Sequence, residues 1–311
     1  YKTLEMNRSE IESTLNAKVE IVKILERDTE RDRGITVPKE KFTSDPDEIF
    51  QDPEIDIVIE LLGGIEPATT FMLSALKNGK HVVTANKAAL AANYHELINT
   101  AKENNVILRF EASVGGGIPI LGTLTGPLRA NKFEEVMGIL NGTTNYILTM
   151  MTKEGLDYET ALKDAQEQGF AEADPTADVE GIDAANKLTI LMALMFDKYV
   201  APKDIPTTGI TEITKEKIEE ARSNGCKIKL IAHAWRDEND EIKYEVRPMY
   251  ISATHPLANI NKEFNAVFVK GNAVDDVMFY GKGAGPLPTG SAVLGDVIDI
   301  STVSYTHLTL P

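Results

Sequence analysis

The spacing of apolar residues in the first third of the chain predicts short strands that alternate with helices. Residues 19–26 (VEIVKILE) alternate as a strand does, and residues 55–62 (IDIVIELL) form the near-continuous apolar run of a parallel strand buried on both faces. The other elements expected here are strands at 81–84 and 106–110 and helices at 1–16, 45–52, 67–78 and 88–105. This order predicts a doubly wound α/β (Rossmann-like) nucleotide-binding domain, which we place at residues 1–131.

A different pattern begins near residue 132. Residues 188–196 are apolar on nearly all sides, so a helix there should be buried. The other elements expected are strands at 136–140, 228–235, 241–250 and 266–269 and helices beginning near Asn145, at 157–168 and at 213–222. We therefore expect a second domain, an α+β domain with a mixed sheet, at residues 132–285.

The two ends of the chain carry expectations of their own. Residues 1–16 are helical from the first residue, and the GxGxxG turn of dinucleotide-binding domains does not precede them. We interpret the chain as a fragment that begins just after that turn; the alternative is a domain that never bound a dinucleotide. Residues 303–311 (VSYTHLTLP) differ in character from all that precedes them, and we interpret them as a non-native tail.

Composition and charge narrow the class of function. Hydrophobic residues make up 42% and charged residues 26% of the 311 residues, which is ordinary for a soluble globular protein with room for two cores. The formal net charge of −16 argues against a nucleic-acid or membrane partner, because either would need a basic face. The single cysteine, Cys226, excludes a disulfide framework, and the histidines lie in no metal-ligand spacing. We expect a cytoplasmic protein.

Candidate chemistry is concentrated just before the apolar helix. Five carboxylates fall within twelve residues there: Glu172, Asp174, Asp178, Glu180 and Asp183. Asp183 and Lys187 are four residues apart and so share one helix face where the helix enters the core. A carboxylate and an amine at that point could form an acid/base pair. The alternative is a solvated surface ion pair of little consequence.

Two long motifs favour the first interpretation. The stretches NGTTNYIL (141–148) and GFAEADPTADVEGIDAANKLTIL (169–191) resemble the signature region of homoserine dehydrogenases. The resemblance continues through VVTANKAALA, FEASVGGGIPIL and GKGAGPLPT, and it covers nearly all of residues 27–301. It implies NAD(P)-dependent interconversion of L-homoserine and L-aspartate 4-semialdehyde in threonine, methionine and isoleucine biosynthesis. It also implies a homodimer formed through the second domain, and a helix at 286–302 that returns to the nucleotide-binding domain.

The resemblance assigns roles to individual residues around the substrate. Lys187 would be the general acid, oriented by Asp183, which could also hold the substrate. Glu172 would bind the substrate α-ammonium group, with Asp178 assisting. The remaining substrate-binding residues that it implies are Gly142 and Thr143, at a helix start, and Lys87, at the junction of cofactor and substrate. The alternatives are a capping role for the helix start and an ordinary surface lysine.

Cofactor and ion sites are implied as well. Arg27 follows the second strand of the domain, where an arginine can accommodate the 2′-phosphate of NADP; flanking acidic residues leave NAD open, and a solvated charged turn is the alternative. The other cofactor-binding residues that the resemblance implies are Asn86, Lys87, Gly169, Gly283 and Gly285. A sodium ion would be bound through main-chain oxygens of Glu111, Val114, Gly116 and Ile118. Without the resemblance, the glycines of that loop would indicate only a tight hinge, and Gly283 and Gly285 only a tight turn.

Two other functions are considered. One is a non-catalytic regulatory or binding relative of the same fold, and the other is a dehydrogenase for a different small amino acid. The presence of Lys187, Asp183 and Glu172 argues against the first, since a binding module needs no such set. The intact AEADPTADVEG segment argues against the second, because it should form the amino-acid pocket.

Overall fold

The computed structural model describes residues 1–29, 31, 34 and 36–309, which fall into two compact units. The first unit comprises Tyr1–Ala112 together with Thr289–Pro311, and the second comprises Ser113–Pro288. These divisions differ from those expected at 131/132 and 285/286. Among the helices that the structure describes, none has the length and apolarity needed to cross a membrane.

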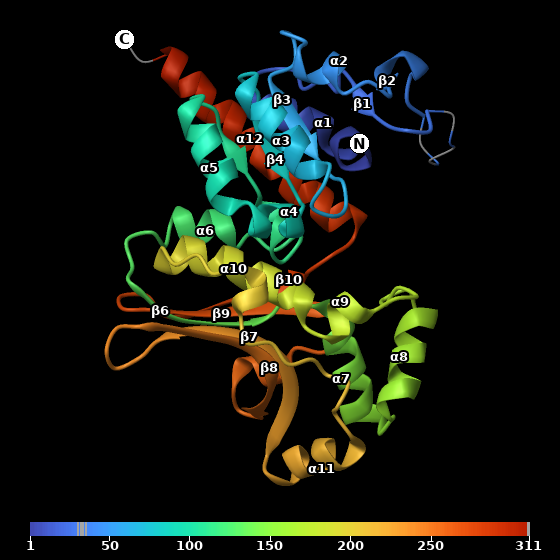
Figure 1. Cartoon of the computed structure of the whole chain (residues 1–311), viewed down its shortest axis with the longest axis vertical. Helices are drawn as coiled ribbons and strands as arrows, with labels where there is room; N and C mark the ends of the chain where they lie inside the picture. The colour runs from blue at the N-terminus through green and yellow to red at the C-terminus, as the bar shows by residue number, and fades with distance from the viewer. Residues whose placement is uncertain (30, 32–33, 35, 310–311) are drawn as a thin grey trace. The chain divides into compact units, whose positions relative to one another are not determined.

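The first unit is built on parallel strands (Figure 1). Strands β3 (Ile57–Glu60), β4 (His81–Thr84) and β5 (Leu108–Arg109) form one sheet in that order, and β1 (Ile24–Leu25) pairs with β2 (Phe42–Thr43). The helices of this unit are α1 (Lys2–Leu15), α2 (Asp47–Phe50), α3 (Ala68–Lys77), α4 (Lys87–Ala92), α5 (Tyr94–Glu103) and most of α12 (Pro286–Thr309), with η1 (Lys39–Lys41) and η2 (Glu111–Ser113) as short 3₁₀ turns.

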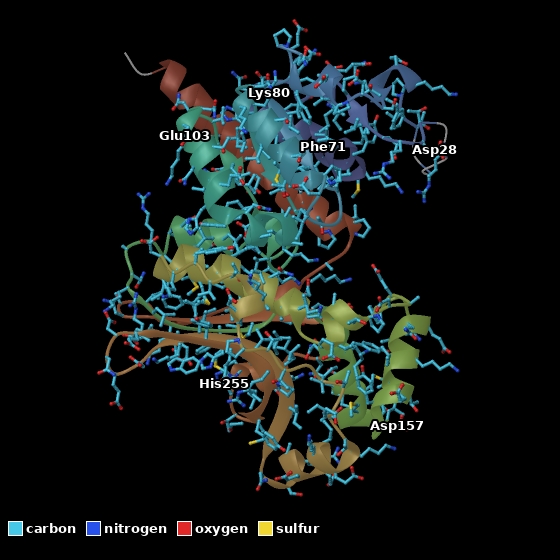
Figure 2. The ribbon with its side chains drawn as sticks, in the orientation of Figure 1. Asp28, Phe71, Lys80, Glu103, Asp157 and His255 are labelled. Carbon is cyan, nitrogen blue, oxygen red and sulfur yellow. The ribbon has the colours of Figure 1, made fainter. Side chains whose placement is uncertain are left out.

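Helices cover both faces of the three-stranded sheet. On one side α3, which carries Phe71 (Figure 2), packs on β3 and β4. The ring centroid of Phe71 lies 5.6 Å from that of Phe50 in α2. Val83 of β4 instead belongs to an apolar cluster with Val293 and Val297 of α12. Because successive side chains of a strand point to opposite faces, α12 covers the side that α3 leaves open. The predicted doubly wound α/β fold is confirmed.

The second unit contains a five-stranded sheet in the order β10-β9-β6-β7-β8, in which every neighbouring pair is antiparallel. One parallel bridge joins Thr207 to Val246, so the sheet has a mixed element as expected. Its strands are β6 (Phe133–Ile139), β7 (Cys226–Arg236), β8 (Ile242–Ser252), β9 (Phe264–Gly271) and β10 (Asp275–Lys282). Its helices are α6 (Leu121–Thr125), α7 (Gly142–Glu154), α8 (Tyr158–Glu167), α9 (Thr176–Val179), α10 (Ile182–Phe196) and α11 (Lys215–Ser223), with 3₁₀ turns η3 (Pro202–Asp204) and η4 (Pro256–Asn259).

Both faces of this sheet are used. Helix α10 packs on β7 and β8 and against α6 (Figure 1). The turn η4 packs on the same two strands, within an apolar cluster that includes Ile231, Met249 and Leu257. The apolar helix expected at 188–196 is therefore buried, and it begins six residues earlier, at Ile182. The early start brings Asp183 and Lys187 into the first two turns.

Several local expectations differ from the structure, and β2, β10, α6 and α9 were not expected at all. The strand expected at 19–26 is limited to Ile24–Leu25. The helix expected at 88–105 is divided into α4 and α5 at Asn93, whose side-chain amide donates a hydrogen bond to Thr69 Oγ1 of α3 at 3.0 Å. The backbone of α12 continues through residues 303–309, part of the stretch interpreted as a non-native tail, and this does not test that interpretation; residues 310–311 lie outside the described residues.

Candidate active site

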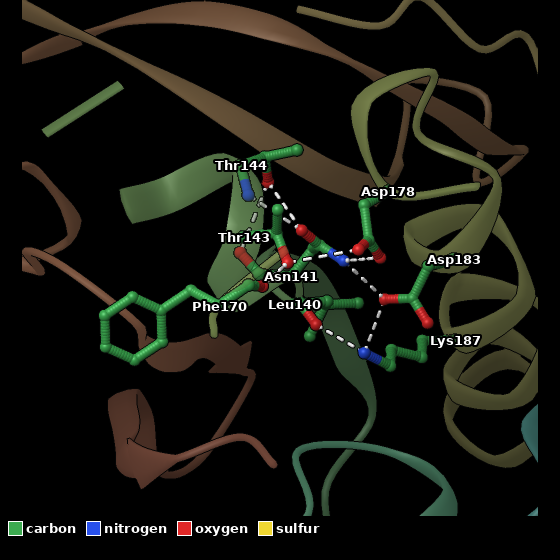
Figure 3. A network of polar contacts seen from close by, with 8 residues as sticks. All are labelled: Leu140, Asn141, Thr143, Thr144, Phe170, Asp178, Asp183 and Lys187. Carbon is green, nitrogen blue, oxygen red and sulfur yellow. Dashed lines mark hydrogen bonds and ion pairs between the residues drawn. The ribbon is translucent and has the colours of Figure 1, made fainter. Parts of the chain in front are cut away.

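Lys187 and Asp183 form a buried ion pair on α10 (Figure 3). The two residues are only 8% and 6% exposed, and Lys187 Nζ lies 2.6 Å from Asp183 Oδ2. Lys187 Nζ also donates a hydrogen bond to the main-chain oxygen of Leu140, at 2.6 Å. The solvated surface pair considered from the spacing is therefore wrong. In a buried site each charge offsets the desolvation cost of the other, and removal of one leaves the other uncompensated.

Asn141 joins this pair to a second carboxylate (Figure 3). Its side-chain amide donates hydrogen bonds to Asp178 Oδ1 at 2.6 Å and to Asp183 Oδ2 at 2.9 Å. Its Oδ1 accepts the main-chain N–H of Thr144 at 2.9 Å, which makes Asn141 the N-cap of α7. A single side chain thus fixes the start of α7 and the separation of two carboxylates.

The segment after α8 is held against the same helix. The Thr143 hydroxyl lies 2.6 Å from the main-chain oxygen of Phe170 and 3.1 Å from Asp178 Oδ2. The Tyr146 ring packs on the Phe170 ring with centroids 4.7 Å apart, and its hydroxyl donates to Asp164 at 2.7 Å. Burial, with that hydrogen bond, raises the pKa of Tyr146 to about 12. The hydroxyl therefore stays protonated and keeps this contact at neutral pH.

The predicted substrate-binding residues of the second unit are not all brought together. Asp178 and Thr143 join the network, whereas the Glu172 side chain is exposed. Gly142 is the first residue of α7, and a Cβ there would lie 2.7 Å from the main-chain oxygen of Glu263. Only glycine permits that approach. Gly169 has a φ of +77° and follows the end of α8, so its conformation is that of a helix-terminating glycine.

The predicted cofactor residues of the first unit lie at the carboxyl ends of its parallel strands, the edge where open α/β sheets bind ligands. Asn86 donates to the main-chain oxygens of Leu62 (3.0 Å) and Gly64 (2.8 Å), and its Oδ1 accepts the N–H of Ala89. It thereby connects the turn after β3 to the start of α4, where Lys87 is the first residue. Arg27 is exposed and follows β1.

A buried carboxylate supports that edge. Glu60, 5% exposed, accepts hydrogen bonds from Thr84 Oγ1 and from the N–H of Leu62, both at 2.6 Å. Thr84 Oγ1 in turn accepts the N–H of Asn86 at 2.9 Å. These bonds position Asn86, and hence the beginning of α4.

The glycine-rich segment expected to bind sodium contains two left-handed residues, Gly115 (φ +74°) and Gly116 (φ +55°). Val114, Gly116 and Ile118 are buried in the second unit, whereas Glu111 opens η2 in the first. The described residues contain no group of three or more His, Cys, Asp or Glu side chains able to hold a metal ion. A sodium ion on main-chain oxygens of this segment stays a prediction.

The segment that contains Gly283 and Gly285 connects β10 to α12. A Cβ at Gly283 would overlap the Asn265 side chain, and Gly285 has a φ of +123°. Both positions therefore require glycine for the turn itself. A role in cofactor binding stays a prediction.

Sequence reasoning understated two residues of the site. The capping role considered for this helix start understates Asn141, and the main-chain oxygen of Leu140 was given no role. The motif Asn-Gly-Thr-Thr before an apolar helix signals the cap. The bridge it forms to Asp178 and Asp183 crosses 37 and 42 residues of sequence, which no local pattern reveals.

Comparisons with known proteins give one family. Residues 119–298 match the family model described as homoserine dehydrogenase, and residues 2–111 match its NAD-binding domain. The homoserine dehydrogenase of Bacillus subtilis is 44% identical over 299 residues, which is 96% of this chain and 69% of the relative. That of Synechocystis is 43% identical over 93% of this chain and 67% of the relative.

Solved structures agree with the sequence relatives. A crystal structure of a homoserine dehydrogenase from Thiobacillus denitrificans superposes with a TM-score of 0.94 at 41% identity, covering all of this chain and 72% of that one. A hyperthermophilic archaeal homoserine dehydrogenase, solved in complex with NADPH, has a TM-score of 0.72 at 30% identity and covers 84% of this chain and 75% of its own.

Proposed function

We propose, from the premise that this chain belongs to the homoserine dehydrogenase family, that Lys187 is the general acid of its reaction. The family assignment makes the chain a nicotinamide-dependent oxidoreductase that acts on a CH–OH group, with L-homoserine and L-aspartate 4-semialdehyde as its substrate pair. The proton-transfer role is carried by one observation, the buried Lys187–Asp183 pair.

A nicotinamide cofactor, when bound, would supply or accept the hydride at the substrate carbon. In the reductive direction the aldehyde oxygen gains negative charge and must take a proton. The Lys187 ammonium has three hydrogens, and Asp183 Oδ2 and the Leu140 oxygen accept two of them. The third hydrogen is available to the substrate oxygen. An ammonium aimed at that oxygen offsets the developing charge and then donates the proton.

The carboxylates take the other end of the substrate. Two carboxylates, Asp178 and Asp183, lie on the one amide of Asn141, and a pair of carboxylates attracts a cationic ligand. The α-ammonium group of homoserine is that cation. Glu172 is exposed on the segment between α8 and α9 and adds a third carboxylate to the same stretch of chain. We assign it to substrate binding.

Cofactor preference, cation and assembly are finer proposals. We propose NADP as the preferred cofactor, with Arg27 at its 2′-phosphate; the test is the ratio of NADP to NAD affinity in Arg27→Ala. We also propose a sodium ion on main-chain oxygens of residues 111–118, supported by the left-handed Gly115 and Gly116. Replacement of sodium by a large organic cation should then lower activity.

We propose in addition a homodimer formed through the second unit, supported by the exposed Met278 and Tyr280 of β10. Light scattering would test it. The place of the reaction in threonine, methionine and isoleucine biosynthesis follows from the same substrate pair.

The decisive experiment is homoserine oxidation by the parent and by Lys187→Met, both made with a glycine-rich dinucleotide-binding turn placed before residue 1. Loss of the proton-transfer group should lower kcat by about 10²–10⁴-fold, while homoserine still protects the variant against thermal unfolding. Lys163→Met, at an exposed lysine, is the control and should match the parent. Near-parent turnover in Lys187→Met would remove the proposed role. No turnover by the parent with either dinucleotide would favour a non-catalytic relative.

A further inference from the structure

Lys229 of β7 is a second buried amine that the proposed reaction does not use. It is 2% exposed, and its Nζ donates hydrogen bonds to Asn145 Oδ1 at 2.8 Å and to the main-chain oxygen of Ile260. Both acceptors are neutral oxygens. A long cationic side chain in such a place costs desolvation free energy and needs a reason to be there.

The bond from Lys229 determines how Asn145 is oriented. With Oδ1 facing the ammonium, Asn145 Nδ2 faces the 260–264 segment and donates to the main-chain oxygens of Ile260 (3.3 Å), Lys262 (2.8 Å) and Phe264 (3.1 Å). An amide turned by 180° would present its oxygen to these carbonyls and its N–H groups to the ammonium. Lys229, together with these three carbonyls, therefore selects one orientation of Asn145.

That orientation fastens the 260–264 segment to the first turns of α7. Gly142 abuts the main-chain oxygen of Glu263, and Thr149 Oγ1 accepts the N–H of Lys262 at 3.0 Å. The segment thus contacts the helix at Gly142, Asn145 and Thr149, on successive turns. Asn145 is the central one of these contacts.

The same helix start carries Asn141. Its two bonds to Asp178 and Asp183, 2.6 and 2.9 Å long, leave little room for displacement. A shift of the first turn would lengthen both bonds and separate the two carboxylates from the helix. The position of the 260–264 segment is thereby linked to the geometry of the substrate-binding network.

We propose that Lys229 is a positioning residue: through Asn145 and the 260–264 segment it holds the start of α7 where Asn141 can bridge Asp178 and Asp183. The inference rests on the proposed function of that network. Lys229 controls homoserine binding without touching the substrate. Proton transfer by Lys187 is a separate step.

The first test is Lys229→Met, with Lys80→Met as the matched control. Lys80 is also a buried lysine, 6% exposed, and donates to the main-chain oxygen of Asp52 in the first unit. Lys229→Met should raise the homoserine KM by about 10–100-fold, as small displacements of binding groups do, with the dinucleotide KM and kcat much less affected. Lys80→Met should leave the homoserine KM unchanged. An unchanged homoserine KM in folded Lys229→Met would overturn the proposal.

A double-mutant cycle separates positioning from general weakening. If Lys229 acts through Asn141, the KM effect of Lys229→Met should largely disappear in an Asn141→Ala background, whereas independent effects would multiply. Multiplying effects would overturn the proposal. If Lys229→Met fails to fold, Asn145→Ala is the second variant to test. It should give the same rise in homoserine KM, and a parent-like KM in Asn145→Ala would also overturn the proposal. These experiments all measure the homoserine KM, whereas the test of Lys187→Met measures kcat. Failure of the Lys229 proposal can therefore be distinguished from failure of the proposed role of Lys187.

Discussion

Two buried lysines approach the start of α7 from different elements, and their surroundings differ in one respect. Lys187 of α10 donates to the Leu140 oxygen and to a carboxylate, Asp183. Lys229 of β7 donates to the Ile260 oxygen and to an amide, Asn145. Both are less than a tenth exposed. The identity of the second acceptor, charged or neutral, is what distinguishes a site for chemistry from a structural cross-link.

The lack of a carboxylate partner affects the pKa of Lys229. Burial, together with the charges of Lys227 and Lys153, lowers the pKa of Lys229 to about 7. Desolvation disfavours the charged form of any amine, and neutral acceptors compensate only in part. A buried lysine therefore needs a carboxylate when its charge is to act on a substrate. Hydrogen-bond acceptors alone are enough when it only holds segments together.

The largest expected difference is in stability. Lys187→Met leaves the Asp183 carboxylate buried without its cation, which should lower the free energy of unfolding by about 3–5 kcal/mol. Lys229→Met removes the donor to the neutral Asn145 Oδ1, while the Ile260 oxygen keeps its bond from Asn145 Nδ2, so the cost should be only about 1–3 kcal/mol. Urea unfolding at pH 7 measures both. The double variant Lys187→Met/Asp183→Leu should recover much of the stability lost in Lys187→Met. Equal losses in Lys187→Met and Lys229→Met would contradict the comparison of the two lysines.

The next effect is a pH dependence that belongs to Lys229. Its pKa is about 7 in the folded chain and near 10.5 when unfolded, so between these values the unfolded chain binds more protons. Stability should therefore rise with pH, by about 2 kcal/mol from pH 7 to pH 9, and the contribution should be constant well below pH 7. The difference between parent and Lys229→Met isolates it. Parallel stability curves for the two proteins would refute the assignment.

A substitution can also make the two sites alike. Asn145→Asp places a carboxylate beside Lys229, as Asp183 stands beside Lys187, and should raise the pKa of Lys229. The rise in stability from pH 7 to pH 9 should shrink by about 1 kcal/mol. Asn145→Leu removes the same amide without adding charge and should keep the rise. The slope against pH is the measurement, because both variants lose the bonds to the 260–264 segment.

The smallest effect is expected where burial is absent. Lys163 and Glu167 are four residues apart on α8, 3.8 Å between charged atoms, with side chains 77% and 65% exposed. Lys163→Ala should change the free energy of unfolding by no more than about 0.5 kcal/mol. A larger change would mean that the i,i+4 spacing, and not burial, determines how much such ion pairs contribute to the stability of this fold.

Local patterns predicted most of the elements, but not β2, β10, α6 or α9, and often not the extents of those they predicted. The strand at 81–84 and the α8 helix are where periodicity and capping placed them, to within a residue. The break between α4 and α5 was missed because its cause is a bond from Asn93 to Thr69, 24 residues away. The strand at 19–26 was overlong because alternation does not specify whether a neighbour is available to pair.

In the site, too, local contacts could be predicted from the sequence and long-range contacts could not. Asp183 and Lys187 could be paired from sequence because helix geometry puts them on one face. Lys229 could not be singled out, since a lysine in an alternating strand reads as an exposed position. Its burial depends on η4 and the 260–264 segment, which lie far from Lys229 in the sequence; Ile260 is 31 residues later in the chain. Contacts of that range require the fold.

The hydrogen count of the Lys187 amine has a consequence for recycling. After an ammonium releases one proton, two hydrogens remain, and two fixed acceptors, Asp183 Oδ2 and the Leu140 oxygen, are already in place for them. Neither acceptor loses its bond, and Asn141 continues to hold the same Asp183 oxygen. The side chain need not rotate or retreat between turnovers. Resetting the enzyme then takes a proton from water and no rearrangement of the protein, so the interval before the next turnover is set by product departure and proton delivery.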